Sequence, residues 1–143
     1  VIRTAWVYSP YGKNFFRTMS QLLRDKPELR VVNDQIGTPT YALDLARAIL
    51  EIVASGKWHS GIYHYSDAGQ ISWYDFALEI QRQIGSRCEL KPIPTSDYPT
   101  PAKRPSYSVL SKEKIIKQFN VLVPDWRESL QRCIAQSLLN QGT

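Results

Sequence analysis

The feature that most constrains the fold is a polar turn, residues 34–40 (DQIGTPT), between a strand-like run and a helix-like run. The run 29–32 before it is apolar and strand-like, and after it apolar residues recur at helical spacing, at Ala42, Leu45, Ala46, Ile49 and Val53. A strand, a shaped polar loop and a helix start predict an edge of the molecule that faces a ligand. The alternative is an ordinary strand-to-helix connection, and most such loops bind nothing.

Several residues of this stretch have a conformational reason to be there. Gly37 permits backbone conformations closed to other residues, and Pro39 holds Thr38 extended. We expect Thr40 to cap the following helix. We expect Asp44, in the first turn of that helix, to interact favourably with the positive end of the helix dipole.

The rest of the chain alternates short strands with helices. Strands are expected at 1–7, 61–65 and 88–93, the last confined to an edge by Pro92 and Pro94. Five helices are expected: one after Asn14, one from the end of the polar turn to about Ala54, one from the capping box of Ser72 and Asp75 to Gly85, one from Ser111 to Asn120, and one after Asp125 and Glu128. The last helix is expected to bury one face, formed by Trp126, Leu130, Cys133, Ile134 and Leu138. Residues 94–105 hold four prolines and are expected to form an extended loop. This order indicates an α/β or α+β unit, a single portion covering residues 1–143.

Composition narrows the class of protein. At 43% hydrophobic and 22% charged residues, the chain reads as a soluble globular unit with no membrane span or secretory signal. Cys88 and Cys133 lack metal-ligand spacing and are expected to be reduced thiols in a cytoplasmic protein. The net charge of +5 suits anionic partners, but the basic residues are scattered, so a nucleic-acid-binding domain is the least favoured function. No metal site is expected. Because Val1 already stands in a strand-like run, we expect a fragment or processed chain.

Two kinds of catalytic machinery are missing from the sequence. A dinucleotide-binding turn needs closely spaced glycines, and no three of the seven glycines stand close enough together. Short-chain reductases need a Tyr with a Lys four residues later, and none of the eight tyrosines has one. We therefore expect neither catalytic nor cofactor-binding residues in this chain.

Three ordered motifs resemble one family over nearly the whole chain. The stretch 34–46 (DQIGTPTYALDLA), with RTAWVY at 3–8 and KRPSYSVL at 103–110, is similar to the C-terminal part of dTDP-4-dehydrorhamnose reductases, which are extended short-chain dehydrogenase/reductases. The resemblance implies an α/β fold, the C-terminal part of a Rossmann-like enzyme without its dinucleotide-binding half. It also implies that the whole enzyme reduces dTDP-4-dehydro-L-rhamnose with NADPH or NADH, bound mainly by the absent half.

The resemblance also implies where the substrate lies. The Trp that matches Trp6 contacts the deoxysugar, and an indole face suits the apolar C–H face of such a sugar; the alternative is a core aromatic residue. Asp34, Gln35, Gly37, Thr38, Pro39 and Thr40 would lie beside the sugar nucleotide, with amides and hydroxyls available to its oxygens.

Other residues are assigned from charge and position alone. We assign Lys103 and Arg104 to the diphosphate from their charge, against the alternative of a solvated loop. Tyr98 and Tyr107 either stack on the thymine base or anchor the loop.

The expected partners are a dTDP-sugar and the missing Rossmann part, with a homodimer also open and neither nucleic acid nor membrane involved. Two alternatives remain. One is a related nucleotide-sugar epimerase or reductase, and the other is a non-catalytic regulatory subunit of the methionine adenosyltransferase beta type.

Overall fold

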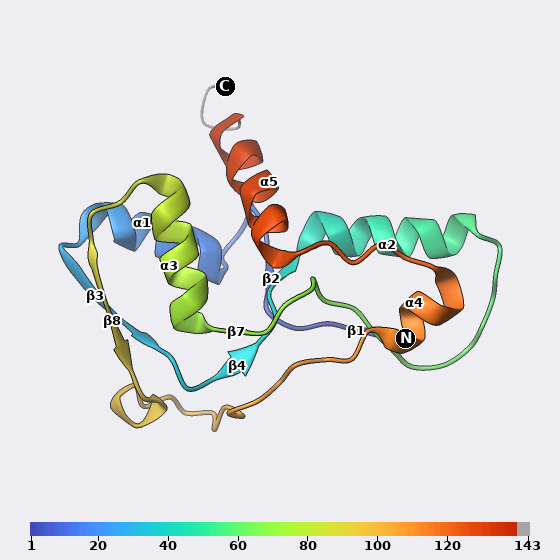
Figure 1. Ribbon diagram of the computed structural model, residues 1–143, viewed down its shortest axis with the longest axis horizontal. Helices are drawn as coiled ribbons and strands as arrows, with labels where there is room; N and C mark the ends of the chain where they lie inside the picture. Colours follow the sequence, from blue (N-terminus) through green and yellow to red (C-terminus); the bar gives the residue numbers. More distant parts are fainter. Residues whose placement is uncertain (140–143) are drawn as a thin grey trace.

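A computed structural model describes residues 1–139, in which short strands alternate with helices (Figure 1). The helices are α1 (Phe15–Asp25), α2 (Ala42–Ala54), α3 (Trp73–Ile84), the 3₁₀ turn η1 (Thr95–Asp97), α4 (Glu113–Phe119) and α5 (Trp126–Leu139). The strands are β1 (Ile2–Arg3), β2 (Val7–Tyr8), β3 (Glu28–Val32), β4 (Ile36–Gly37), β5 (Thr40–Tyr41), β6 (Tyr63–His64), β7 (Ile71–Ser72) and β8 (Glu89–Ile93). The α/β class is confirmed. None of the helices in this part of the chain is long and apolar enough to cross a bilayer.

The strands form pairs rather than one broad sheet. Within residues 1–139, β1 pairs with β6, β2 with β5 and β3 with β8 in parallel, while β4 and β7 are antiparallel. The longest pair runs from Glu28 opposite Glu89 to Val32 opposite Ile93. Pro92 cannot donate a backbone hydrogen bond, so β8 is suited to an edge, as expected from the sequence.

Two apolar clusters hold these elements together. The first gathers Tyr8, Phe16, Phe76, Trp126 and Leu130 where α1, α3 and α5 meet β2. The second joins α2, α4 and β6 through Ala48, Tyr63, Tyr65, Ile115 and Val121. Figure 1 shows α1, α3 and the β3–β8 pair at one end of the molecule, α2 and α4 at the other, and α5 between them.

Several helix ends form as their local sequence predicts. The side chain of Asn14 accepts a hydrogen bond from the Arg17 backbone N–H and caps α1. At the end of α3, Gly85 adopts φ 69°, and at the end of α4 Asn120 adopts φ 56°, both in the left-handed region.

The capping box of α3 gives a direct stability prediction. The Ser72 hydroxyl accepts from the Asp75 N–H at 3.0 Å, and the Asp75 carboxylate accepts from the Ser72 N–H at 2.8 Å. Ser72→Ala is expected to lower the free energy of unfolding by about 1 kcal/mol, because a part-buried helix-end N–H loses its acceptor. Urea denaturation measures this, with exposed Ser60→Ala as the matched control. Equal unfolding free energies for the two variants would contradict it.

The apolar residues that recur along α2 do not all face the core. Ile49 and Val53 are 41% and 55% exposed, and Ala46 is exposed too, whereas Asp44 and Ala48 are buried. The rotation has a physical cause: Asp44 points inward because it pairs with Arg132 of α5. As a result, several apolar side chains of α2 point toward solvent.

Several smaller expectations are corrected at the helix ends and loops. Thr40 does not cap α2; the cap residue is Tyr41, and the Thr40 hydroxyl donates instead to the Ala5 carbonyl at 2.6 Å. Lys112 holds the cap position of α4 and makes no side-chain cap bond, whereas the Ser111 hydroxyl accepts from the Glu113 N–H at 3.4 Å.

At α5, Asp125 accepts from the Arg127 N–H, but within the described chain no bond from Glu128 completes a capping box. Leu138 of the expected buried stripe is 57% exposed. The loop 94–105 contains the short turn η1.

Candidate functional site

Trp6 is the centre of the candidate site. Its indole stacks on that of Trp73, with ring centroids 3.6 Å apart and an interplanar angle of 14°. We call these two side chains the indole platform. Both are half-buried, so the platform keeps an open part. Phe15 supports it, with its ring centroid 4.6 Å from that of Trp73.

The polar turn lies directly against this platform. A Cβ atom built on Gly37 would stand 2.6 Å from both Cε2 and Cζ2 of Trp6, far inside van der Waals contact. Only glycine therefore lets strand β4 approach the indole so closely. The two motifs, separated by about thirty residues in sequence, form one surface.

The backbone at Trp6 is strained. Its φ is 48°, in the left-handed region that non-glycine residues rarely adopt. The Thr40 N–H donates to the Trp6 carbonyl at 3.1 Å, and Val7 pairs with Thr40 between β2 and β5, so neighbouring strands hold this conformation. Strain of this kind concentrates at functional sites, and an indole fixed by its backbone is pre-organised for a ligand.

The third motif runs along the other side of Gly37. The Ile36 N–H donates to the Ser106 carbonyl, and the Ser108 N–H donates to the Ile36 carbonyl, both at 2.8 Å. Tyr107 pairs with Ile36, and its hydroxyl donates to Gln70 at 3.3 Å. All three sequence motifs therefore meet at the indole platform.

Asp34 and Gln35 are engaged with the η1 turn. The Asp34 carboxylate accepts from both the N–H and the hydroxyl of Thr95, which lowers the pKa of Asp34. The Gln35 amide donates to the same hydroxyl at 3.0 Å. These side chains tie the polar turn to the end of β8.

The hydroxyls of Thr38 and Thr40 are not available to a ligand, so that part of the expectation is wrong. Both residues are almost wholly buried, as is Pro39 between them. Thr38 donates to the Gly69 carbonyl at 2.7 Å and Thr40 donates to that of Ala5. A buried hydroxyl needs a partner, and the nearest acceptors are backbone carbonyls. These threonines shape the turn rather than line its surface.

Lys103 and Arg104 lie on the exposed loop that leads to Ser106. Neither makes an ion pair with any residue in the range 1–139. The positive charges of Lys103 and Arg104 therefore have no acidic partner among these residues. The loop that carries them continues into Ser106 and Ser108, which bond to β4.

Sequence reasoning missed Trp73 as part of the site. It stands at the first position of α3, and the sequence signals only the cap before it. Neither a motif nor periodicity could indicate the stack, because Trp6 and Trp73 meet only through tertiary packing.

A buried polar network lies in the interior, between the two ends of the molecule. Asp44, 3% exposed, receives two hydrogen bonds of 2.6 Å from Arg132 and one of 2.7 Å from the Ser129 hydroxyl. Asp67 is fully buried and accepts from the Tyr41 N–H through one carboxylate oxygen, while the other has no partner within the described chain. Burial and the nearby Asp44 charge raise the pKa of Asp67 to about 7.

The raised pKa of Asp67 predicts a pH dependence of stability. Because the folded pKa is above the unfolded one, the folded state holds this proton more tightly, and the stability it contributes is lost as pH rises through about 7. Between about pH 5 and pH 8 the unfolding free energy of the wild type should fall by about 2 kcal/mol relative to Asp67→Asn. Urea denaturation at each pH measures it. Exposed Asp25→Asn is the control, and parallel wild-type and Asp67→Asn curves would contradict the prediction.

Known proteins match the chain along almost its whole length. The profile of the family described as RmlD substrate binding domain matches residues 1–139. A dTDP-4-dehydrorhamnose reductase of Burkholderia thailandensis is 40% identical, and the match covers 97% of this chain and 51% of that protein. The chain thus spans about half the length of such relatives.

Solved structures agree with the profile. A dTDP-4-dehydrorhamnose reductase from Clostridium acetobutylicum superposes with a TM-score of 0.87 at 41% identity, over 94% of this chain and 47% of that one. The enzyme of the same name from Bacillus anthracis, solved in complex with NADP, superposes with a TM-score of 0.88 at 34% identity and the same coverage. With the profile covering residues 1–139, this chain belongs to the RmlD substrate-binding domain family.

Proposed function

We propose that this chain is the sugar-nucleotide-binding portion of an NAD(P)H-dependent reductase that converts dTDP-4-dehydro-L-rhamnose to dTDP-L-rhamnose. The observation that carries the proposal is the meeting of Trp6, Gly37 and the segment 106–108 on one surface. The relatives named dTDP-4-dehydrorhamnose reductase support the choice of substrate.

The residues around the platform suit the parts of such a substrate. The flat indole of Trp6, backed by Trp73, offers an apolar face to the C–H face of a deoxysugar. Lys103 and Arg104 carry the charge that a diphosphate needs, and a guanidinium binds two of its oxygens at once. Tyr107 is 58% exposed and pairs with Ile36 of β4, and we assign it to the base. Asp34, Gln35, Thr38, Pro39 and Thr40 hold the turn in shape.

The residues described here do not fit a nicotinamide cofactor. Their glycines, at 12, 37, 56, 61, 69 and 85, are too widely spaced to cradle a dinucleotide. No Tyr has a Lys four residues later. We assign cofactor binding and proton transfer to a nucleotide-binding half outside these residues, and this chain alone is expected to be inactive.

The outward face of α2 is the proposed contact with that half. Leu43, Ile49, Leu50 and Val53 are 40%, 41%, 67% and 55% exposed and lie on one helix. An apolar patch of this kind marks an interface, and the chain spans only about half of its relatives. The proposed occupant is the missing half, whereas a concentration-dependent dimer of this chain through α2 would indicate a second copy instead.

Substrate binding is tested at the platform. Trp6→Ala is expected to weaken dTDP-L-rhamnose binding roughly tenfold, because the sugar loses its aromatic contact. Isothermal titration calorimetry measures the affinity, and Trp58→Ala is the control because Trp58 is 82% exposed. Unchanged affinity in Trp6→Ala would place the sugar elsewhere.

The choice of nucleotide is tested by parallel titrations. The chain is expected to prefer dTDP-L-rhamnose over UDP- and GDP-sugars. A preference for a UDP-sugar would favour a related epimerase, and no nucleotide-sugar binding at all would favour a regulatory subunit.

A further inference from the structure

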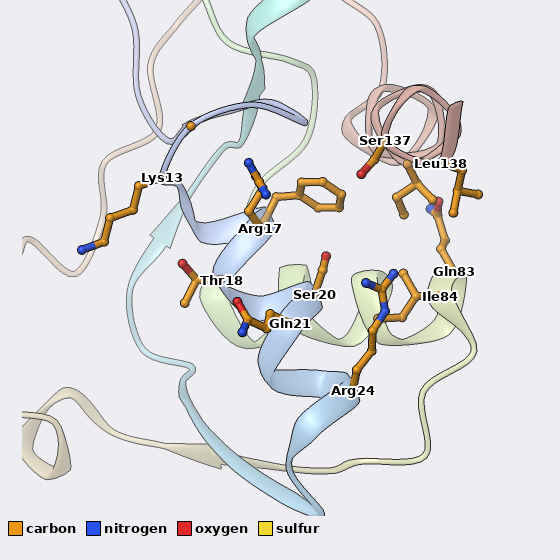
Figure 2. Close-up of a pocket in the computed structure, with 13 residues that line it drawn as sticks. Lys13, Arg17, Thr18, Ser20, Gln21, Arg24, Gln83, Ile84, Ser137 and Leu138 are labelled. Carbon is orange, nitrogen blue, oxygen red and sulfur yellow. The ribbon is translucent and has the colours of Figure 1, made fainter. Parts of the chain in front are cut away.

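A cavity lies away from the indole platform, between α1, the end of α3 and α5 (Figure 2). Its volume is about 610 Å³, within the size range of small-molecule sites. Arg17, Ser20 and Arg24 line it from α1. At 100° per residue these three point away from Phe15, which faces the platform, so the two sites lie on opposite sides of α1.

The charge of this cavity is one-sided. No Asp or Glu is among the residues that line it, whereas Lys13, Arg17 and Arg24 are. None of the three makes an ion pair with a residue of the part that the structure describes. Figure 2 shows the Arg24 guanidinium directed toward the space, Arg17 at its edge, and Lys13 extending away from it. Uncompensated guanidinium groups on one face attract an anion.

Ser20 is an independent indication of a ligand. It is only 8% exposed, and its hydroxyl has no hydrogen-bond partner in the structure. Buried hydroxyls are normally bonded, so one left without a partner beside a cavity indicates a missing partner there. Figure 2 shows this hydroxyl and that of Ser137 directed toward the same space from α1 and α5. Ser20 is three residues after Arg17 and four before Arg24, so the three side chains lie on one face of α1.

The remaining wall suits the organic part of a ligand. Phe16, 3% exposed, with Ile84 and Ile134, forms an apolar side, and the amides of Gln21 and Gln83 stand at its border. We propose that this cavity binds a small organic phosphate, with Arg17, Arg24 and Ser20 holding the phosphate and the apolar side holding the rest. This site is separate from the sugar-nucleotide site proposed above.

Inorganic pyrophosphate is the probe, titrated into the isotope-labelled chain while backbone amide NMR shifts are followed. Shifts are expected in α1 and at Gln83 and Ser137. Arg17→Gln combined with Arg24→Gln should weaken binding about tenfold, because two charge-assisted contacts are lost. Lys57→Gln combined with Lys117→Gln removes the same charge from exposed positions elsewhere and should leave the affinity within about twofold. Equal weakening in both pairs would overturn the proposal.

Two further variants complete the test. Ser20→Ala should weaken pyrophosphate binding without lowering the urea midpoint, since its hydroxyl has no hydrogen-bond partner among residues 1–139. Unchanged affinity would overturn the role of Ser20. Lys103→Gln combined with Arg104→Gln should leave the pyrophosphate-induced NMR shifts of α1 intact while weakening the binding of dTDP-L-rhamnose. Loss of the α1 shifts in this pair would refute a separate site, whereas failure of dTDP-L-rhamnose binding alone bears only on the proposed function.

Discussion

Replacing Arg132 with Met is expected to lower the free energy of unfolding by about 3 kcal/mol, because a buried carboxylate then loses the nearer of its two charge partners. Asp44 is 3% exposed, and both of its oxygens accept from Arg132 at 2.6 Å. Ser129 still donates to one oxygen but cannot neutralise the charge, and the more exposed Arg47 guanidinium stays 4.0 Å from the other oxygen, too far for a hydrogen bond. Met fills the volume of the Arg stem, so the loss reports the charge pair and not a cavity.

Urea denaturation measures the Arg132→Met effect, with Arg87→Met, an exposed Arg, as the control. Adding Asp44→Asn should restore part of the stability, since the buried charge itself is removed. An Arg132→Met protein as stable as the control would show that Arg47 or solvent compensates the charge of Asp44. The consequence reaches beyond stability, because this pair joins α2 to α5 and fixes which face of α2 points outward.

Gly37→Ala is expected to cost about 2 kcal/mol of stability and to weaken dTDP-L-rhamnose binding more than Trp6→Ala does. The added methyl would stand 2.6 Å from two carbons of the Trp6 indole and 3.0 Å from the Ser108 hydroxyl oxygen. Gly37 is buried and paired with Ile71, so the backbone has little room to retreat. The Trp6 indole is therefore expected to leave its stack with Trp73 and to occupy the space proposed for the sugar.

A double-variant cycle identifies the cause. Trp6→Ala removes the atoms that the methyl meets, so Gly37→Ala made in that background should cost much less than in the wild type. Equal costs in both backgrounds would locate the strain elsewhere, at Ser108 or in β4 itself. Near-ultraviolet circular dichroism reports the loss of the indole stack independently of binding.

Local signals predicted much of the fold. The cap at Asn14, the capping box at Ser72 and Asp75, and the stop at Gly85 form as expected, because each depends on groups within a few residues. Thr40 failed as a cap because the Ala5 carbonyl, a tertiary neighbour, takes its hydroxyl. The inward position of Asp44 on α2 also depends on a distant partner, since Arg132 lies 88 residues from Asp44.

For the candidate site too, local features could be predicted from the sequence, whereas contacts between distant residues could not. Sequence alone determined the order of the helices and of the longer strands, the three motifs, and the lack of a glycine-rich cradle, since these are properties of neighbouring residues, whereas the two-residue strands β4, β5 and β7 were not expected. Tertiary structure alone decided that Trp6 stacks on Trp73, that Ser106 and Ser108 bond to Ile36, and that Thr38 and Thr40 are buried. These contacts join residues far apart in the chain, and packing, not local preference, selects the partner of a buried polar or aromatic group.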